Sequence, residues 1–106
     1  MARTPTRIHG PAQVSNSAAT KYTVPGATTA LLRSIHVSNP SASAVDFTMS
    51  IGTDAAGTRI YDGYPIAADS AKTFWCYHAV ATGEILQAFA GTNNILTLTL
   101  NADLIT

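Results

Sequence analysis

The chain has 106 residues, of which 46% are apolar and only 11% charged, and its six basic and six acidic residues give no net charge. This length predicts one domain with a modest core, and the apolar content excludes an intrinsically disordered chain. The neutral balance excludes the long-range attraction to nucleic acid that basic domains exert. Nothing in the sequence resembles a signal peptide or a membrane span, so we expect a soluble protein made in the cytoplasm, with no nucleic-acid or membrane partner.

Residues 1–11 predict an extended N-terminal arm rather than a core element. They contain two prolines, two arginines and one glycine, and Ile8 is the one large aliphatic residue after Met1. We expect this arm to dock on a neighbouring chain, with Arg3 and Arg7 donating to carboxylates and Ile8 as an apolar anchor. The alternative is that the arm folds back on its own domain and closes a sheet edge.

Residues 12–106 predict a single β-sandwich domain of eight or nine short strands. The predicted strands cover residues 12–15, 21–24, 29–39, 44–52, 58–62, 64–67, 72–79, 84–90 and 96–101. Turn signals separate them about every 8 to 12 residues, and no long segment keeps a helical period. We therefore predict an all-β fold, namely an antiparallel two-sheet sandwich that is jelly-roll-like, preceded by the extended arm.

The clearest alternation of apolar and polar residues lies in residues 45–51 and 96–101. Successive side chains of a strand point to opposite faces, so each of these segments has one buried face. In residues 31–38, Leu31, Ile35 and Val37 share one parity, which predicts a common inward face. The predicted core comprises Ile35, Val37, Val45, Phe47, Met49, Ile51, Leu96, Leu98 and Leu100.

No group of residues forms a catalytic or metal-binding pattern, so we predict a non-enzymatic protein without cofactor or metal. The sequence has three histidines, which lack the spacing of a zinc site and a nucleophile motif: His9, His36 and His78. Three loop aspartates match no calcium-binding motif: Asp54, Asp62 and Asp69.

Four aromatic residues are the best candidates for recognition: Tyr61, Tyr64, Trp75 and Tyr77. Exposed on one sheet, they would form a platform for stacking sugars or a hot spot for a protein partner. The alternative is that part of this set fills the core, because one parity of residues 72–79 must face inward. Exposed, coplanar Trp75 and Tyr77 side chains would favour sugar binding, whereas a buried Trp75 would favour a scaffold.

Several stretches of the chain resemble a known family. They are Lys-Tyr-Thr-Val-Pro-Gly at residues 21–26, the strand that ends in Ser-Asn at 38–39, Ile-Tyr-Asp-Gly-Tyr-Pro-Ile-Ala at 60–67, Gly-Glu-Ile-Leu-Gln-Ala-Phe-Ala at 83–90 and Leu-Thr-Leu-Thr-Leu-Asn at 96–101. Over residues 20–101 this pattern resembles small virion structural proteins of tailed bacteriophages. The resemblance implies a virion subunit made in the host cytoplasm: a capsid decoration or cement protein, or a neck or tail component. It implies phage capsid or other virion proteins as partners, and no catalytic residues.

The composition also predicts association with other chains. A nearly uncharged surface rich in Ala, Thr and Ser does little to oppose contact, so we expect a homo-oligomer or part of a larger shell. A second class of function stays open beside the virion subunit. It is a carbohydrate-binding β-sandwich module for host attachment, and it depends on the four aromatic residues.

Overall fold

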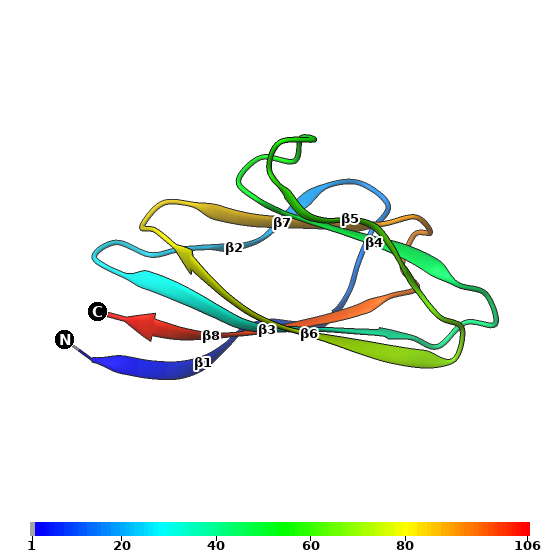
Figure 1. The fold of residues 1–106 in the computed structure, drawn as a ribbon, viewed down its shortest axis with the longest axis horizontal. Helices are drawn as coiled ribbons and strands as arrows, with labels where there is room; N and C mark the ends of the chain where they lie inside the picture. The colour runs from blue at the N-terminus through cyan, green and yellow to red at the C-terminus, as the bar shows by residue number, and fades with distance from the viewer. Residues whose placement is uncertain (1) are drawn as a thin grey trace.

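The computed structural model describes residues 2–106 as two stacked β-sheets, without any helix in that range (Figure 1). Met1, the first residue of the predicted arm, lies outside the described residues. The strands are β1 (Arg3–Gln13), β2 (Ala19–Thr23), β3 (Thr29–Asn39), β4 (Val45–Ile51), β5 (Arg59–Ile66), β6 (Ser70–Val80), β7 (Ile85–Ala90) and β8 (Thr97–Ile105). The predicted all-β, antiparallel two-sheet sandwich is confirmed.

The strands pair as a set of nested hairpins. Sheet A has the order β1-β8-β3-β6 and sheet B the order β2-β7-β4-β5, and all neighbours are antiparallel. Thus β4 pairs with β5, β3 with β6, β2 with β7 and β1 with β8. The two chain ends lie together at one end of the molecule (Figure 1), where Ala2 and Thr106 exchange backbone hydrogen bonds of 3.1 and 3.0 Å.

The core lies between the two sheets and is built from the inward parity of each strand. All the predicted core residues are buried except Ile51, which is half-buried and packs against the others. The alternation predicts these residues correctly because each strand buries one face against the other sheet and exposes its other face to water. The largest fully buried side chains are Phe47, Leu32, Ile35, Met49, Ile66, Leu86, Leu96, Leu98 and Leu100.

Leu31 is buried as its parity predicts, but it lies outside the core cluster that contains Ile35 and Val37. The pairing of β3 with both of its neighbours shifts between Leu32 and Ser34, which changes the inward parity of β3 along its length. Leu32 therefore joins the core together with Ile35, while Leu31 pairs with Asp103 on the opposite face. A β-bulge of this kind depends on the neighbouring strands, so a parity count within one strand does not detect it.

The arm predicted for residues 1–11 is wrong from Arg3 onward, because Arg3–Gln13 form β1 at the edge of sheet A. This strand pairs with β8 from Arg3 opposite Ile105 to Gln13 opposite Thr97. An edge strand has one unpaired side, which tolerates prolines, and shifts in pairing on either side of His9 break the apolar alternation. The chain thus adopts the alternative in which the N-terminus closes a sheet edge.

The predicted break at Gly63 is a bulge inside one strand. β5 runs unbroken through Gly63, which has a φ of 63° and donates its backbone N–H to the Thr48 hydroxyl at 3.0 Å. The pairing of β5 with β4 shifts here, between Tyr64 opposite Phe47 and Tyr61 opposite Met49. The extra residue lets both tyrosines point to the same side of the strand.

Candidate functional site

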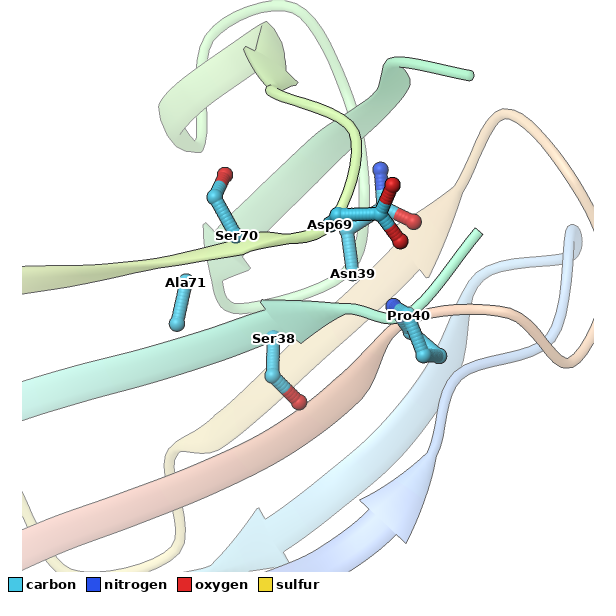
Figure 2. A pocket seen from close by; sticks show the side chains of 6 residues that line it. All are labelled: Ser38, Asn39, Pro40, Asp69, Ser70 and Ala71. Atoms are coloured by element: carbon cyan, nitrogen blue, oxygen red, sulfur yellow. The ribbon is translucent and has the colours of Figure 1, made fainter. Parts of the chain in front are cut away.

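A shallow, open hollow lies where the β3–β4 turn meets the β5–β6 turn (Figure 2). It is lined by six small residues, of which four have polar side chains: Ser38, Asn39, Pro40, Asp69, Ser70 and Ala71. In Figure 2 the side chains of Ser38 and Ser70 point in opposite directions. One carboxylate and a few hydroxyl groups that do not converge give this hollow no catalytic constellation.

The side chain of Asn39 connects the turns at this end of the molecule. Its side chain is buried, and its Nδ2 donates to the carbonyl oxygens of Ser43 and Ile66, each at 2.9 Å. Its Oδ1 accepts from the backbone N–H and the hydroxyl of Ser41 at 3.0 and 2.7 Å. These hydrogen bonds tie the β3–β4 turn to the end of β5, so the role of Asn39 is structural.

Of the three loop aspartates compared with calcium ligands, Asp54 and Asp62 bind Arg59, and Asp69 lies apart from them. Arg59 donates to Asp54 from Nε at 2.9 Å and from Nη2 at 3.1 Å, and to Asp62 from Nη1 at 3.1 Å. The hydrogen bonds from Arg59 and from Ser50 lower the pKa of the Asp54 carboxyl. Asp69 lies near the hollow, and the described residues contain no group of three potential ligands around a common centre.

Two large aromatic side chains stand in solvent on the outer face of sheet A. Trp75 is 81% exposed and Tyr77 65% exposed, both on β6. The other parity of this strand faces inward, because Phe74 is buried and Cys76 packs against the core. A tryptophan this exposed costs hydration free energy in the isolated chain, which makes this face the strongest candidate for a binding surface.

A continuous row of polar contacts crosses sheet A beside these aromatic residues. Arg3 on β1 and Arg33 on β3 both donate to Oδ2 of Asp103 on β8, at 2.9 and 2.8 Å. The hydrogen bonds from Arg3 and Arg33 lower the pKa of the Asp103 carboxyl. The guanidinium carbon of Arg33 also lies 5.8 Å from the centre of the Tyr77 ring, within the range of a cation–π contact.

A second row lies parallel to the first. Arg7 pairs with Asn101 in the strand register, Asn101 Nδ2 donates to the Ser34 hydroxyl at 3.3 Å, and Ser34 pairs with Trp75. We call the surface formed by Arg3, Arg7, Arg33, Asp103, Trp75 and Tyr77 the cationic aromatic face. It carries three arginines and one aspartate, so the rest of this neutral chain has an excess of two negative charges.

The predicted partner-binding residues therefore do not form one cluster. Arg3, Arg7, Trp75 and Tyr77 share the cationic aromatic face, and Ile8 packs against the core of its own chain. Tyr61 and Tyr64 pack around Phe74, with ring centres 4.2 and 4.9 Å from its own. They cover the side of the core between β5 and β6.

Sequence reasoning missed the contributions of Arg33 and Asp103. The last strand was expected to end at residue 101, whereas β8 continues to Ile105. The alternation in the sequence indicates this longer strand. Ala102 and Leu104 continue the inward parity of Leu96, Leu98 and Leu100, which leaves Asp103 on the outer face. Arg33 lies at the bulge in β3, so its position depended on the register of three strands.

The burial of His9 leads us to expect that the protein loses stability in mild acid. Its Nε2 atom is buried without a hydrogen-bond partner. Burial, and secondly the charge of Lys21, lower the pKa of His9 from its ordinary 6.5, although a backbone hydrogen bond with Lys21 opposes this in part. The folded state thus favours the neutral ring of His9. The contribution of the neutral ring to stability is fully present above about pH 6.5, and it is lost as the pH falls toward the lower pKa of the folded state.

We expect urea unfolding between pH 7 and pH 5 to show a falling free energy of unfolding, with a smaller slope for His9→Gln. Lys21→Met should reduce the slope in part, because it removes the second cause of the shift. The carboxyls of Asp54 and Asp103 do not affect this window, since their pKa values lie below the ordinary 3.8. An unchanged slope in His9→Gln would contradict the role of His9.

No known protein-family model matches this chain, and no curated protein sequence shows detectable similarity to it. Among residues 2–106 there is no helix long and apolar enough to cross a membrane.

Proposed function

We propose that this chain is a non-enzymatic virion structural protein, a capsid decoration or cement subunit that attaches to the capsid exterior through the cationic aromatic face. The observation that carries the proposal is the exposure of Trp75 and Tyr77, at 81% and 65%, beside a row of arginines. Trp, Tyr and Arg are the residues most enriched among binding hot spots. A head–tail neck or tail component would use the same face on a different virion surface.

The strand order supports this class of protein by analogy. Eight strands paired as nested hairpins across two sheets are the pattern expected of a jelly roll, an architecture found among viral capsid and lectin domains. Folds host many functions, so this analogy supports the class of protein and the surface residues carry the proposed site.

The charges of the face indicate the chemistry of its partner. Asp103 already binds Arg3 and Arg33, which leaves the face with an excess of positive charge around two exposed rings. An acidic capsid surface that presents carboxylates to Arg7 and Arg33, and an apolar side chain to Trp75, would complement it. Arginine is well suited here because its planar fork binds carboxylates with two donors.

We expect Trp75→Ala to weaken attachment to capsids by about 30-fold or more, since the loss of a hot-spot tryptophan costs about 2 kcal/mol or more. Tyr77→Ala should weaken it less, because this ring is less exposed and already contacts Arg33. The melting temperatures of both variants should stay close to that of the parent, since both side chains lie outside the core. Co-sedimentation with capsids that lack the protein is the measurement.

Thr23→Ala is the matched control, because Thr23 is exposed on β2 in the other sheet. It should bind capsids as the parent does. Equal binding by the Trp75 variant and this control would contradict attachment through the cationic aromatic face. Failure of the parent protein to bind any virion component would overturn the virion proposal itself.

The same observation supports a second candidate, a carbohydrate-binding module for host attachment. Exposed Trp75 and Tyr77 can stack on sugar rings, while Arg33 and Asn101 supply hydrogen-bonding groups beside them. Titration with host surface polysaccharides, followed by tryptophan fluorescence, tests this candidate. Saturable quenching that is lost in Tyr77→Ala, without binding to capsids, would favour the sugar-binding module over the decoration subunit.

A further inference from the structure

We propose that two copies of this chain associate through β6, each pairing antiparallel with β6 of the other copy to extend sheet A across a two-fold axis. The proposal goes beyond the proposed function and does not rest on it, because it concerns the free protein. It follows from a comparison of the strands at the edges of the two sheets.

Residues 2–106 form four edge strands: β1 and β6 in sheet A, and β2 and β5 in sheet B. An edge strand presents unpaired backbone donors and acceptors to other chains. Natural proteins protect such edges by shortness, prolines, bulges or charges. A long edge strand with few of these features is therefore a site for pairing with another chain.

Three of the four edges carry such protection. β1 has Pro5, Pro11, two arginines and two shifts in pairing around His9. β5 has Pro65, Asp62 and the bulge at Gly63, which break up its edge. β2 has only five residues, with a shift in pairing at Lys21.

The fourth edge, β6, carries the least protection: its pairing with β3 also shifts, between Trp75 and His78, but its side chains still alternate regularly between exposed and more buried positions. It has 11 residues, contains no proline, glycine or acidic residue, and has one basic residue, Lys72, near its start. Within the described part of the chain it pairs only with β3, and Ala71, Trp75, Tyr77 and Ala79 are exposed along it. Aromatic residues favour strand pairing, and this segment is rich in them.

Identical strands that pair antiparallel form a closed two-fold contact. Trp75 is the middle residue of β6, so pairing centred on Trp75 engages the whole strand. In this register Lys72 lies opposite His78 of the second copy rather than opposite a second lysine, and Ala71 lies opposite Ala79. Residues opposite one another share a face, so the outer faces of sheet A in the two copies become continuous.

The arrangement has a consequence for binding. The two Trp75 side chains meet on the outer face, and the two cationic aromatic faces become one surface of twice the size. A repetitive partner could then engage both copies at once, which raises the apparent affinity without any new type of contact.

Analytical ultracentrifugation of the free protein tests the dimer, and a pair of charge variants tests the pairing. Ala71→Lys with Ala79→Lys places like charges opposite each other twice, and we expect the dimer to weaken by about tenfold or more. Ala71→Lys with Ala79→Glu places opposite charges at the same two points, and we expect it to restore the dimer. Thr4→Lys with Thr23→Lys adds the same charge as the double-lysine variant to two protected edges and should leave the dimer unchanged.

Amide hydrogen exchange gives an independent readout on the parent protein. Protection of residues 70–80 should rise with protein concentration, while protection of β1, β2 and β5 should not. A parent protein that stays monomeric at every concentration would overturn the proposal. A dimer in which the Lys–Glu variant associates no better than the double-lysine variant would overturn the centred β6 pairing, and melting temperatures near that of the parent show that the variants are folded.

Discussion

Replacing Phe47 with alanine is expected to lower the free energy of unfolding by about 3 to 5 kcal/mol. Phe47 is fully buried on β4, with its ring centre 6.3 Å from that of Phe74 on the opposite sheet. It pairs with Tyr64 on one side and Ala90 on the other, so its removal leaves a cavity between the sheets that the strands cannot readily close. The expected loss is a large share of the stability of a domain of this size.

Urea or thermal unfolding measures this effect, and the melting temperature should fall by more than about 12 °C. Two controls separate the cavity from a general effect of losing a ring. Phe47→Leu keeps most of the volume and should cost less than about 1.5 kcal/mol. Phe89→Ala removes a half-buried ring on which Arg59 lies and should cost less than Phe47→Ala. An effect of Phe47→Ala no greater than that of Phe89→Ala would contradict a core centred between β4 and β6.

Gly10→Ala is expected to lower the free energy of unfolding by roughly 3 to 5 kcal/mol, although it adds only one methyl group. Gly10 has a φ of 75°, a conformation that alanine adopts only with strain. A β-carbon at this position would overlap the carbonyl oxygen of Leu98 and lie 2.9 Å from the backbone nitrogen of Ala12. Both obstacles are main-chain atoms, so relief requires β1 to move away from Leu98 on β8 and to change its own backbone between Gly10 and Ala12.

The matched controls for Gly10→Ala are Gly26→Ala and Gly57→Ala, where an added β-carbon meets nothing within 4 Å. Each should change the free energy of unfolding by less than about 1 kcal/mol. Hydrogen exchange should show the damage of Gly10→Ala first in β1 and β8. A small effect equal to that of the controls would contradict the close pairing of β1 with β8, and would favour the free arm that the N-terminal composition predicts.

These two substitutions also bear on the proposed site. Arg3 and Arg7 reach the cationic aromatic face because β1 pairs with β8, so a displaced β1 would remove Arg3 from the row with Asp103 and Arg7 from the row with Asn101. Gly10→Ala protein that remains folded should therefore lose part of its partner binding while Trp75 and Tyr77 stay in place. Phe47 lies on sheet B, so the Phe47→Ala molecules that remain folded should keep the cationic aromatic face intact.

The sequence alone determined the fold class and most of the core. Residues 45–51 and 96–101 alternate so regularly that only a strand with one buried face accommodates them, and the structure buries that parity as expected. The alternation in residues 74–77 likewise separated Phe74 and Cys76 from Trp75 and Tyr77. A local period is enough for such predictions because each strand buries one face against a single neighbouring sheet.

Tertiary structure decided which strands are neighbours and where their registers shift. The prolines and arginines of residues 1–11 predict an arm when read alone, yet β8 provides a free edge with which Arg3–Gln13 pair. The bulges near Arg33 and Gly63 shift the register between adjacent strands, and they reverse the parity on which local prediction depends. Asp103 therefore meets both Arg3 and Arg33, from positions 100 and 70 residues away in the chain, because sheet pairing connects residues that no local pattern relates.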